Sequence, residues 1–585
     1  MSEETPAGWR GTTRSLTRKL LGKCTVDWAI TATITLVFAF TLLGVRVWGF
    51  REDGEIPPWF ALLKGREGEP ALAVLAAVIV AGVAAWGVIR RFGVPRQVAR
   101  LSAGIALLAV FVGGLNFFQG TRVSATTYFH EHDVYHYMLG AKYLPEVGYL
   151  DLYECTIQAI PDRIPDSRRI RNLATYQRVT VGDYRDGTVP MPDCREQFSE
   201  ERWEEFQRDL EVFFSARMGT PRNFIRDNGY NGGPFHSFFA HHVSNLFEFS
   251  IENANRAAMI DVALVCLVIL VVARTFGPWY AILFALFVFT NPVDRWSING
   301  GSFLRYMWFS SLVFGLCAAK TGRWGWAGAW LTISTALNIF PGMFLLGYLA
   351  HHGFACLRER RVTGAAWRAL RGCVAAGLCV LALSMAHTRG PANFTDYREA
   401  LEPHSERVRY GHVGFGTGLR YAAGYRGQHT ADAVREGFPH SRRVAQLEEI
   451  RWLITGLGLM GLFFTLAMTT RLDAVESASL VGFVGFFGLL STTGYYFTCA
   501  CALVLMAHRK LFDSGGLAVL LLLLCANFAG MFYIIQDHAH RFVLYNAVMT
   551  MSWLAWIIVA IAYFGVRTEV FDRMSRFLFK PAREP

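Results

Sequence analysis

A nine-residue stretch, 129–137, contains three histidines, two carboxylates and three aromatic side chains. Its carboxylates, Glu131 and Asp133, could divide the roles of general base and electrostatic partner, or could bind a divalent cation. An E-x-D triplet is also common in ordinary solvated loops. The stretch follows an apolar run, 101–118, and opens the longest polar region of the chain, which places the acids near a predicted membrane surface. We therefore predict that Asp133 is a general base and that Glu131 is its partner or a metal ligand.

The histidines of this stretch suggest a second chemistry. His132 and His136 are four residues apart, a spacing that suits a metal ion shared on one face of a helix. No cysteine or further His–carboxylate motif lies close by in the sequence to complete a zinc site. Interfacial histidines more often form hydrogen bonds with carbonyls or lipid phosphates. Zinc is therefore the less favoured interpretation, and we expect any cation, Mg²⁺ or Mn²⁺, to be bound by Glu131 and Asp133.

A second polar cluster, 536–545, lies at the predicted outer end of an apolar segment. Its Arg541, together with His538 and His540, could bind a phosphate, because the guanidinium fork matches the geometry of phosphoryl oxygens. The alternative is an arginine that only extends to the membrane interface. The density of polar groups favours a phosphate-binding site at these three residues.

Several other polar residues are weaker candidates for the site of an acceptor substrate. They are His132, His136, Tyr137, Asn231, His236, Arg305 and His404. Of these, His236 lies close to His241 and His242 on one predicted helix, and the three could simply line the core of their own loop.

Two cysteines differ from the others. Cys155 and Cys194 share one long polar loop, whereas most of the remaining cysteines lie in apolar segments, where small buried thiols are expected. If the loop is extracytoplasmic, a disulfide between the two is about as plausible as two free thiols.

The composition is typical of a membrane protein. Of 585 residues, 53% are hydrophobic and only 18% are charged, against about 25% in ordinary soluble domains. A net charge of +11 would suggest a nucleic-acid partner for a soluble protein. Here the arginines flank apolar runs, as the positive-inside rule describes, so we expect no nucleic acid. The composition predicts an all-α polytopic membrane protein in contact with the lipid bilayer.

About fourteen apolar segments (roughly 12–14) are predicted to be transmembrane helices. They are 28–49, 71–89, 101–118, 257–274, 278–291, 303–320, 324–339, 341–356, 372–387, 451–469, 476–492, 494–507, 515–534 and 542–566. If the basic N-terminus is inside, alternation puts every short basic loop inside and both long polar loops outside. All the candidate site residues then converge on one face, the extracytoplasmic one.

The predicted spans divide the chain into seven parts. They are a cytoplasmic tail (1–27), three transmembrane helices (28–118), an extracytoplasmic loop domain with the acidic motif (119–256), central transmembrane helices (257–387), a second extracytoplasmic loop (388–450), C-terminal transmembrane helices (451–566) and a cytoplasmic tail (567–585). The arginine-, alanine- and glycine-rich composition is typical of bacteria. We therefore expect a multi-pass protein of the bacterial inner membrane with both termini in the cytoplasm.

Three local patterns resemble the GT-C superfamily of integral-membrane glycosyltransferases, in particular its mannosyltransferase-like branch. The first is the acidic motif at 131–133 in an early large outer loop. The second, 537–545, is similar to the His-Lys-Glu-Glu-Arg-Phe-Leu type of motif, and the third, 337–341, looks like a Lys-x-x-Pro turn. Three predicted spans precede the acidic loop where the family usually has one. Asn338 also replaces the lysine, and 539–540 reads Ala-His in place of paired glutamates.

The resemblance implies a GT-C-like fold and inverting transfer of a sugar from a polyprenyl-phosphate donor to a hydroxyl of a glycan, lipid or protein. It implies Asp133 as the general base, and Arg541 and His538 at the donor phosphate. Two alternatives stay open. One is another lipid-linked transferase or ligase of envelope glycan assembly, which would use the Arg/His cluster without a carboxylate base. The other is a transporter, which would carry charged residues at mid-membrane and broken helices in paired halves.

Overall fold

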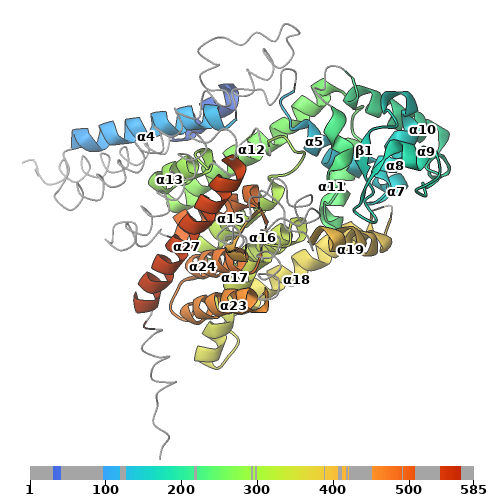
Figure 1. Cartoon of the computed structure of the whole chain (residues 1–585). Coiled ribbons are helices and arrows are strands. Elements are labelled where there is room, and N and C mark those ends of the chain that lie inside the picture. The colour runs from blue at the N-terminus through green and yellow to red at the C-terminus, as the bar shows by residue number, and fades with distance from the viewer. Residues whose placement is uncertain are drawn as a thin grey trace, which may run out of the picture.

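A computed structural model describes most of the chain. The described residues are 30–40, 96–118, 127–215, 221–291, 294, 296, 300–387, 389–405, 412–416, 419, 451–490, 492–506, 541–567 and 569. Within them the chain is mostly helical, with two short two-stranded sheets. Figure 1 shows the elements from α5 to α11 gathered at one end of a bundle formed by the later helices. The expected helical fold is confirmed at this level.

The residues 127–250, called the loop domain below, combine short helices with one longer helix and a hairpin. The α-helices are α5 (Glu131–Val134), α6 (Gly140–Lys142), α7 (Leu144–Val147), α8 (Leu152–Ala159), α9 (Val181–Arg185), α10 (Glu200–Phe213) and α11 (Pro234–Ser244). A π-helix, η2 (Tyr135–Leu139), joins α5 to α6, and 3-10 turns lie at η3 (Pro161–Arg163), η4 (Arg195–Gln197) and η6 (Pro221–Arg226). Strand β1 (Arg169–Arg171) pairs antiparallel with β2 (Arg178–Thr180), with Ile170 opposite Val179.

Helix α10 shows how local sequence determines where a helix of the loop domain begins and which face it buries. Ser199 caps its N-terminus by accepting a hydrogen bond from the Arg202 backbone N–H at 3.3 Å. Phe206, Leu210 and Phe213 form its buried face, at the helical spacing that the sequence shows.

The disulfide considered from the sequence is present in the loop domain. Cys155 of α8 is bonded to Cys194, which directly precedes η4, and both residues are buried. This covalent link joins α8 to the segment that leads into α10. The packing of α8 against α10 is therefore fixed by a bond as well as by contacts.

Three helices of the described residues are long and apolar enough to cross a membrane. They are α12 (Ile251–Phe276), α18 (Gly364–Met385) and α23 (Arg451–Met468). Shorter apolar helical stretches are Ile30–Phe40, Leu101–Phe117 within α4 (Arg96–Phe117), α13 (Pro278–Phe289), α15 (Met307–Lys320), α24 (Ala474–Leu489), Gly494–Met506 and Trp553–Gly565 within α27 (Arg541–Arg567).

The expected count of about fourteen spans is therefore not confirmed. At 1.5 Å per residue, the 14 residues of α15 rise about 21 Å, which is short of a hydrocarbon core of about 30 Å. The predicted spans 71–89 and 515–534 lie outside the described residues. By length and composition, three of the described helices are compatible with membrane residence.

The bundle is completed by further elements that connect these helices. They are α16 (Trp324–Leu337), α17 (Gly342–Glu359), α19 (Ala392–Ser405), β3 (His412–Val413), β4 (Thr492–Thr493), η7 (Gly494–Ala500) and α25 (Cys501–Met506). Strand β3 pairs antiparallel with β4, which joins the second long loop to the segment after α24.

The loop domain rests on the bundle through α11, which packs against α16 and α18, and through α19. The hydroxyl of Tyr149 donates to the side-chain oxygen of Asn393 on α19 at 3.0 Å. Arg389, just before α19, forms an ion pair with Asp396 at 2.5 Å and donates to the carbonyl of Pro145 at 3.2 Å. The loop domain and α19, from the described part of the second long polar segment, thus lie together at one end of the bundle (Figure 1).

Candidate functional site

The stretch 129–137 is anchored to the bundle by its backbone. The His130 N–H donates to the carbonyl of Gly300 at 3.0 Å, and the indole of Trp296 donates to the carbonyl of Tyr128 at 2.8 Å. The Tyr128 N–H in turn donates to the side-chain oxygen of Asn255 on α12 at 2.7 Å. The chain then enters α5 and the π-helix η2. Because π-helical turns are rare and often occur at functional sites, this geometry marks the stretch independently of its composition.

Asp133 lies where the loop domain contacts the bundle. Its Oδ2 accepts a hydrogen bond from the Ser302 hydroxyl at 2.7 Å and lies 3.1 Å from His130 Nδ1. Burial acts to raise the pKa of this carboxyl. The neighbouring His130, followed by Arg305 and His132, outweighs burial and keeps the pKa well below its usual range. Asp133 is therefore ionised at neutral pH.

Arg305 is a buried cation that lowers the pKa of this carboxyl. Its side chain is 6% exposed, and its guanidinium lies over the rings of Tyr137, Tyr495 and Tyr496 at 4.6, 4.8 and 5.3 Å. One terminal nitrogen donates to the Tyr496 hydroxyl at 3.2 Å. Its Nε has no hydrogen-bond partner within the described residues. A desolvated guanidinium with spare donor capacity is suited to bind an anion.

Most of the weaker candidates from the sequence gather around Tyr137. Its hydroxyl forms a short hydrogen bond with the side-chain oxygen of Asn231, and its ring lies 5.8 Å from the ring of His236 and under Arg305. His236 Nδ1 also lies 3.1 Å from the Tyr230 hydroxyl. The structure therefore brings four of the predicted residues into one cluster beside Asp133.

Glu131 is directed elsewhere. It accepts a hydrogen bond from the Thr127 hydroxyl at 3.1 Å. Among the described residues, the only group of three or more His, Cys, Asp or Glu side chains arranged to hold a metal is His132, His136 and Asp227. The metal ligands expected from the sequence, Glu131 and Asp133, are not in that group.

The predicted phosphate-binding residues cannot be placed beside Asp133. His538 and His540 lie outside the described residues. Arg541 opens α27, but its side chain lies outside the described part, as does that of His404 in α19. The pairing of Asp133 with Arg541 thus stays a prediction.

Sequence reasoning missed several residues of the site. Ser302 reaches it from a turn of the bundle, and Tyr495 and Tyr496 reach it from η7. Asp227 reaches it from the loop between η6 and α11. The only signals available were a doubled tyrosine in an apolar region and an acid that opens a glycine-rich turn. Neither pattern indicates a site without knowledge of its neighbours.

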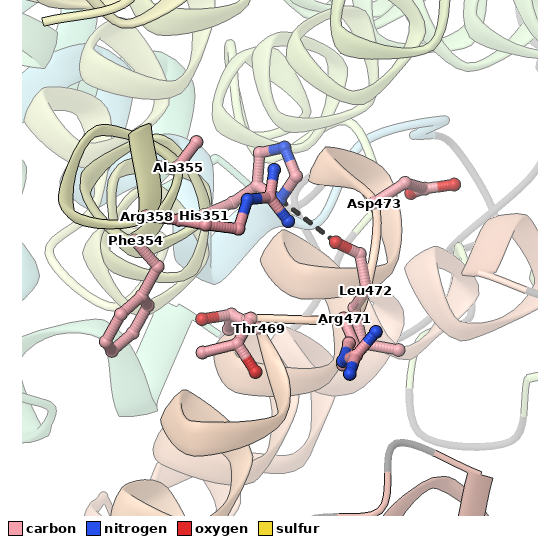
Figure 2. Close-up of a pocket in the computed structure, with 9 residues that line it drawn as sticks. His351, Phe354, Ala355, Arg358, Thr469, Arg471, Leu472 and Asp473 are labelled. Atoms are coloured by element: carbon pink, nitrogen blue, oxygen red, sulfur yellow. Dashed lines mark hydrogen bonds between the residues drawn. The ribbon is translucent and has the colours of Figure 1, made fainter. Parts of the chain in front are cut away.

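A cavity of about 360 Å³ lies elsewhere, between the C-terminal half of α17 and the turn that joins α23 to α24. Figure 2 shows Arg358 and Arg471 on its wall, and His351 Nδ1 donating to the carbonyl of Leu472 at 3.0 Å. Its basic lining belongs to the segments that the sequence analysis assigns to the cytoplasmic side. It shares no lining residue with the Asp133 cluster.

Comparisons of the chain with protein-family models, with curated proteins and with solved structures give no match. The functional argument therefore depends on the geometry described above.

Proposed function

We propose that this protein is a membrane glycosyltransferase that moves a sugar from a polyprenyl-phosphate donor to an acceptor hydroxyl. The observation that supports it is the juxtaposition of an ionised carboxylate, Asp133, with a buried guanidinium, Arg305, where the loop domain meets apolar helices. A lipid-linked donor needs both features at a membrane surface. Its tail stays in the bilayer while its phosphate and sugar meet polar side chains.

Each group has a role in such a reaction. The acceptor hydroxyl gives up its proton as its oxygen attacks the anomeric carbon, and the bond to the phosphate oxygen breaks. Negative charge then develops on the departing polyprenyl phosphate. Arg305 stabilises this charge, because it is desolvated and held in place by three tyrosine rings before the reaction begins. It thus takes the role that the sequence suggested for Arg541.

Two assignments of the general base are consistent with the geometry. Asp133 can accept the proton directly. Alternatively His130 accepts it at its other ring nitrogen, while Asp133 Oδ2, 3.1 Å from His130 Nδ1, stabilises the imidazolium that forms. The variant His130→Gln distinguishes the two assignments, because it abolishes turnover only if His130 is the base.

The test uses the purified full-length protein in lipid nanodiscs with a panel of polyprenyl-phosphate sugars and a membrane extract as the acceptor source. Release of polyprenyl phosphate is measured. We expect Asp133→Asn to lower turnover by about 10²–10⁴-fold, the usual contribution of a general base. Arg305→Gln should lower it as well. The control is Asp166→Asn, an exposed carboxylate of the same domain that pairs with Arg185.

The outcomes discriminate between the candidate functions. Full activity of Asp133→Asn together with loss in Arg305→Gln would favour another lipid-linked transferase that needs no carboxylate base. No turnover of any donor by the wild-type protein, together with uptake of a solute into proteoliposomes, would favour the transporter and reject the proposal.

A further inference from the structure

A compact set of nitrogen and oxygen donors lies next to the proposed catalytic carboxylate. His132, His136 and Asp227 each present one ligand atom, and these atoms all lie within 4.8 Å of one another. His132 Nε2 is 2.9 Å from Asp227 Oδ2. The two histidines are one helical turn apart across α5 and η2, while Asp227 arrives from the loop after η6. The set is therefore created by the tertiary fold.

The hydrogen bonds around His136 prepare it to bind a cation. Its Nδ1 lies 2.6 Å from the backbone carbonyl of His132, which accepts only, so Nδ1 carries the proton. Its Nε2 therefore carries the lone pair, which accepts a hydrogen bond from the Tyr153 hydroxyl at 2.6 Å. Histidines that bind metals are commonly oriented in this way, by donating their other N–H to a backbone carbonyl.

The surroundings of the set provide support and access. The Tyr153 hydroxyl accepts a hydrogen bond from the Gly229 N–H at 3.0 Å, and the ring of Phe224 lies 5.8 Å from that of His132. The side chains of His132 and Asp227 are 27% and 40% exposed, so an ion can enter from solvent. A supported ligand shell with an entry path is what a metal site requires.

We propose that His132, His136 and Asp227 form a binding site for a transition-metal cation of the Zn²⁺ type. Two imidazoles and one carboxylate favour Zn²⁺ over Mg²⁺ or Ca²⁺, which prefer oxygen ligands alone. Ligands 2.0–2.1 Å from a tetrahedral ion are about 3.3 Å apart. The 2.9 Å pair would need to open by a few tenths of an ångström, and the wider pairs, up to 4.8 Å apart, would need to close. The Tyr153 hydroxyl would give up its bond to Nε2.

The ion has a positional role. It would join the start of the helix that carries Asp133 to the loop that carries Asn231. Asp133 directly follows the first ligand, but its carboxylate points to Ser302 and His130, so a role as base for a metal-bound water does not follow from the geometry. The inference does not depend on the proposed glycosyl transfer, because its test measures metal.

The first experiment uses the wild-type full-length protein, purified through an affinity tag without histidine. The protein is stripped with a chelator, reloaded with Zn²⁺ or Co²⁺, and freed of excess ion. We expect about one equivalent of Zn²⁺ by elemental analysis and a Co²⁺ visible spectrum of a tetrahedral N/O site that Zn²⁺ abolishes. Zn²⁺ should also raise the melting temperature, since it binds only the folded state. Failure of the protein to retain an equivalent, or an octahedral Co²⁺ spectrum, would reject the site.

The second experiment compares Asp227→Asn and His132→Asn with a matched control, His242→Gln. In α11, His242 Nδ1 lies 2.7 Å from the carbonyl four residues earlier, and the same distance for His136 is 2.6 Å. His242 belongs to no such donor group in the described chain. We expect both site variants to lose affinity for Zn²⁺ by more than about tenfold and the control to retain it. Unchanged affinity in folded site variants would overturn the assignment. If a variant fails to fold, the Co²⁺ spectrum of the wild-type protein decides.

Discussion

The loop domain and the helical bundle are stabilised by different kinds of contact. In the loop domain, Lys142 is 1% exposed and lies 2.7 Å from both Glu205 and Asp209. The guanidinium of Arg202 lies 4.4 Å from the centre of the Tyr143 ring. In the bundle, by contrast, helices approach at small residues. A Cβ on Gly372 of α18 would collide with the backbone of Gly325 on α16, and one on Gly458 of α23 with that of Gly488 on α24.

The glycine contacts of the bundle are those expected of helices in a membrane. Apolar side chains gain little by leaving lipid, so helices in a membrane associate through close backbone packing at glycine and other small residues. The loop domain relies on buried charges, a disulfide and aromatic packing. The proposed site lies at the boundary, with Asp133 from the loop domain and Arg305 from the bundle. Its geometry therefore needs both kinds of packing to be intact.

The largest expected effect comes from breaking the buried charge network of the loop domain. Lys142→Met leaves the buried carboxylate of Asp209 without its cation, and removal of one partner of a buried pair costs about 3–5 kcal/mol. Glu205 keeps its ion pair with Arg202 at 2.6 Å. Chemical unfolding of the purified protein measures the loss. Arg163→Met is the control, because its ion pair with Glu211 is exposed and should change nothing measurable. Equal losses of stability in the two variants would contradict the expected difference between the buried and the exposed ion pair.

The second prediction concerns pH. Burial raises the pKa of Glu154 to about 7, although the Tyr184 hydroxyl, which donates to it at 2.6 Å, acts in the opposite direction. The folded state then retains this proton up to a higher pH than the unfolded chain. The free energy of unfolding therefore falls by a total of about 3 kcal/mol as pH rises from about 4.5 to about 7. It stays constant at higher pH.

The variant Glu154→Gln should remove this contribution. We expect the free energy of unfolding of the wild-type protein, relative to the variant, to be greater at pH 5 than at pH 8. Parallel pH curves for the two proteins would show that Glu154 has an ordinary pKa. The experiment tests whether the loop domain buries charge at a cost, as the comparison with the bundle implies.

The smallest effect is expected in the bundle. Gly372→Ala places a methyl group against the Gly325 carbonyl, and overpacking of this kind costs about 1–3 kcal/mol. Gly377→Ala, on the same helix, is the matched control because a Cβ there meets nothing within 4 Å. The melting temperature, measured by thermal unfolding in nanodiscs, should be lowered in Gly372→Ala only. A similar decrease in both would mean that helix propensity or lipid contact, not the α16–α18 interface, decides the result.

Local features of the fold could be predicted from the sequence. The Ser199 cap and the apolar face of α10 depend on residues within a few positions of one another, and the structure has both. The apolar runs at 257–274, 372–387 and 451–469 each correspond to a helix long enough to span a membrane. The count of spans was less predictable, because several apolar runs form helices of 12 to 16 residues once turns and packing set their ends.

The candidate site was only partly predictable for a related reason. The stretch 129–137 stands out by its composition, and residue types and short spacings are properties of the sequence alone. The partners of its side chains are not, since Asp227, Ser302 and Arg305 reach it from turns whose positions depend on how the helices pack. Burial also has no local signature, because it is the surrounding fold that desolvates Arg305 and aligns three tyrosines with it. Sequence determines which groups are present, and the tertiary structure decides which of them meet and in what dielectric they act.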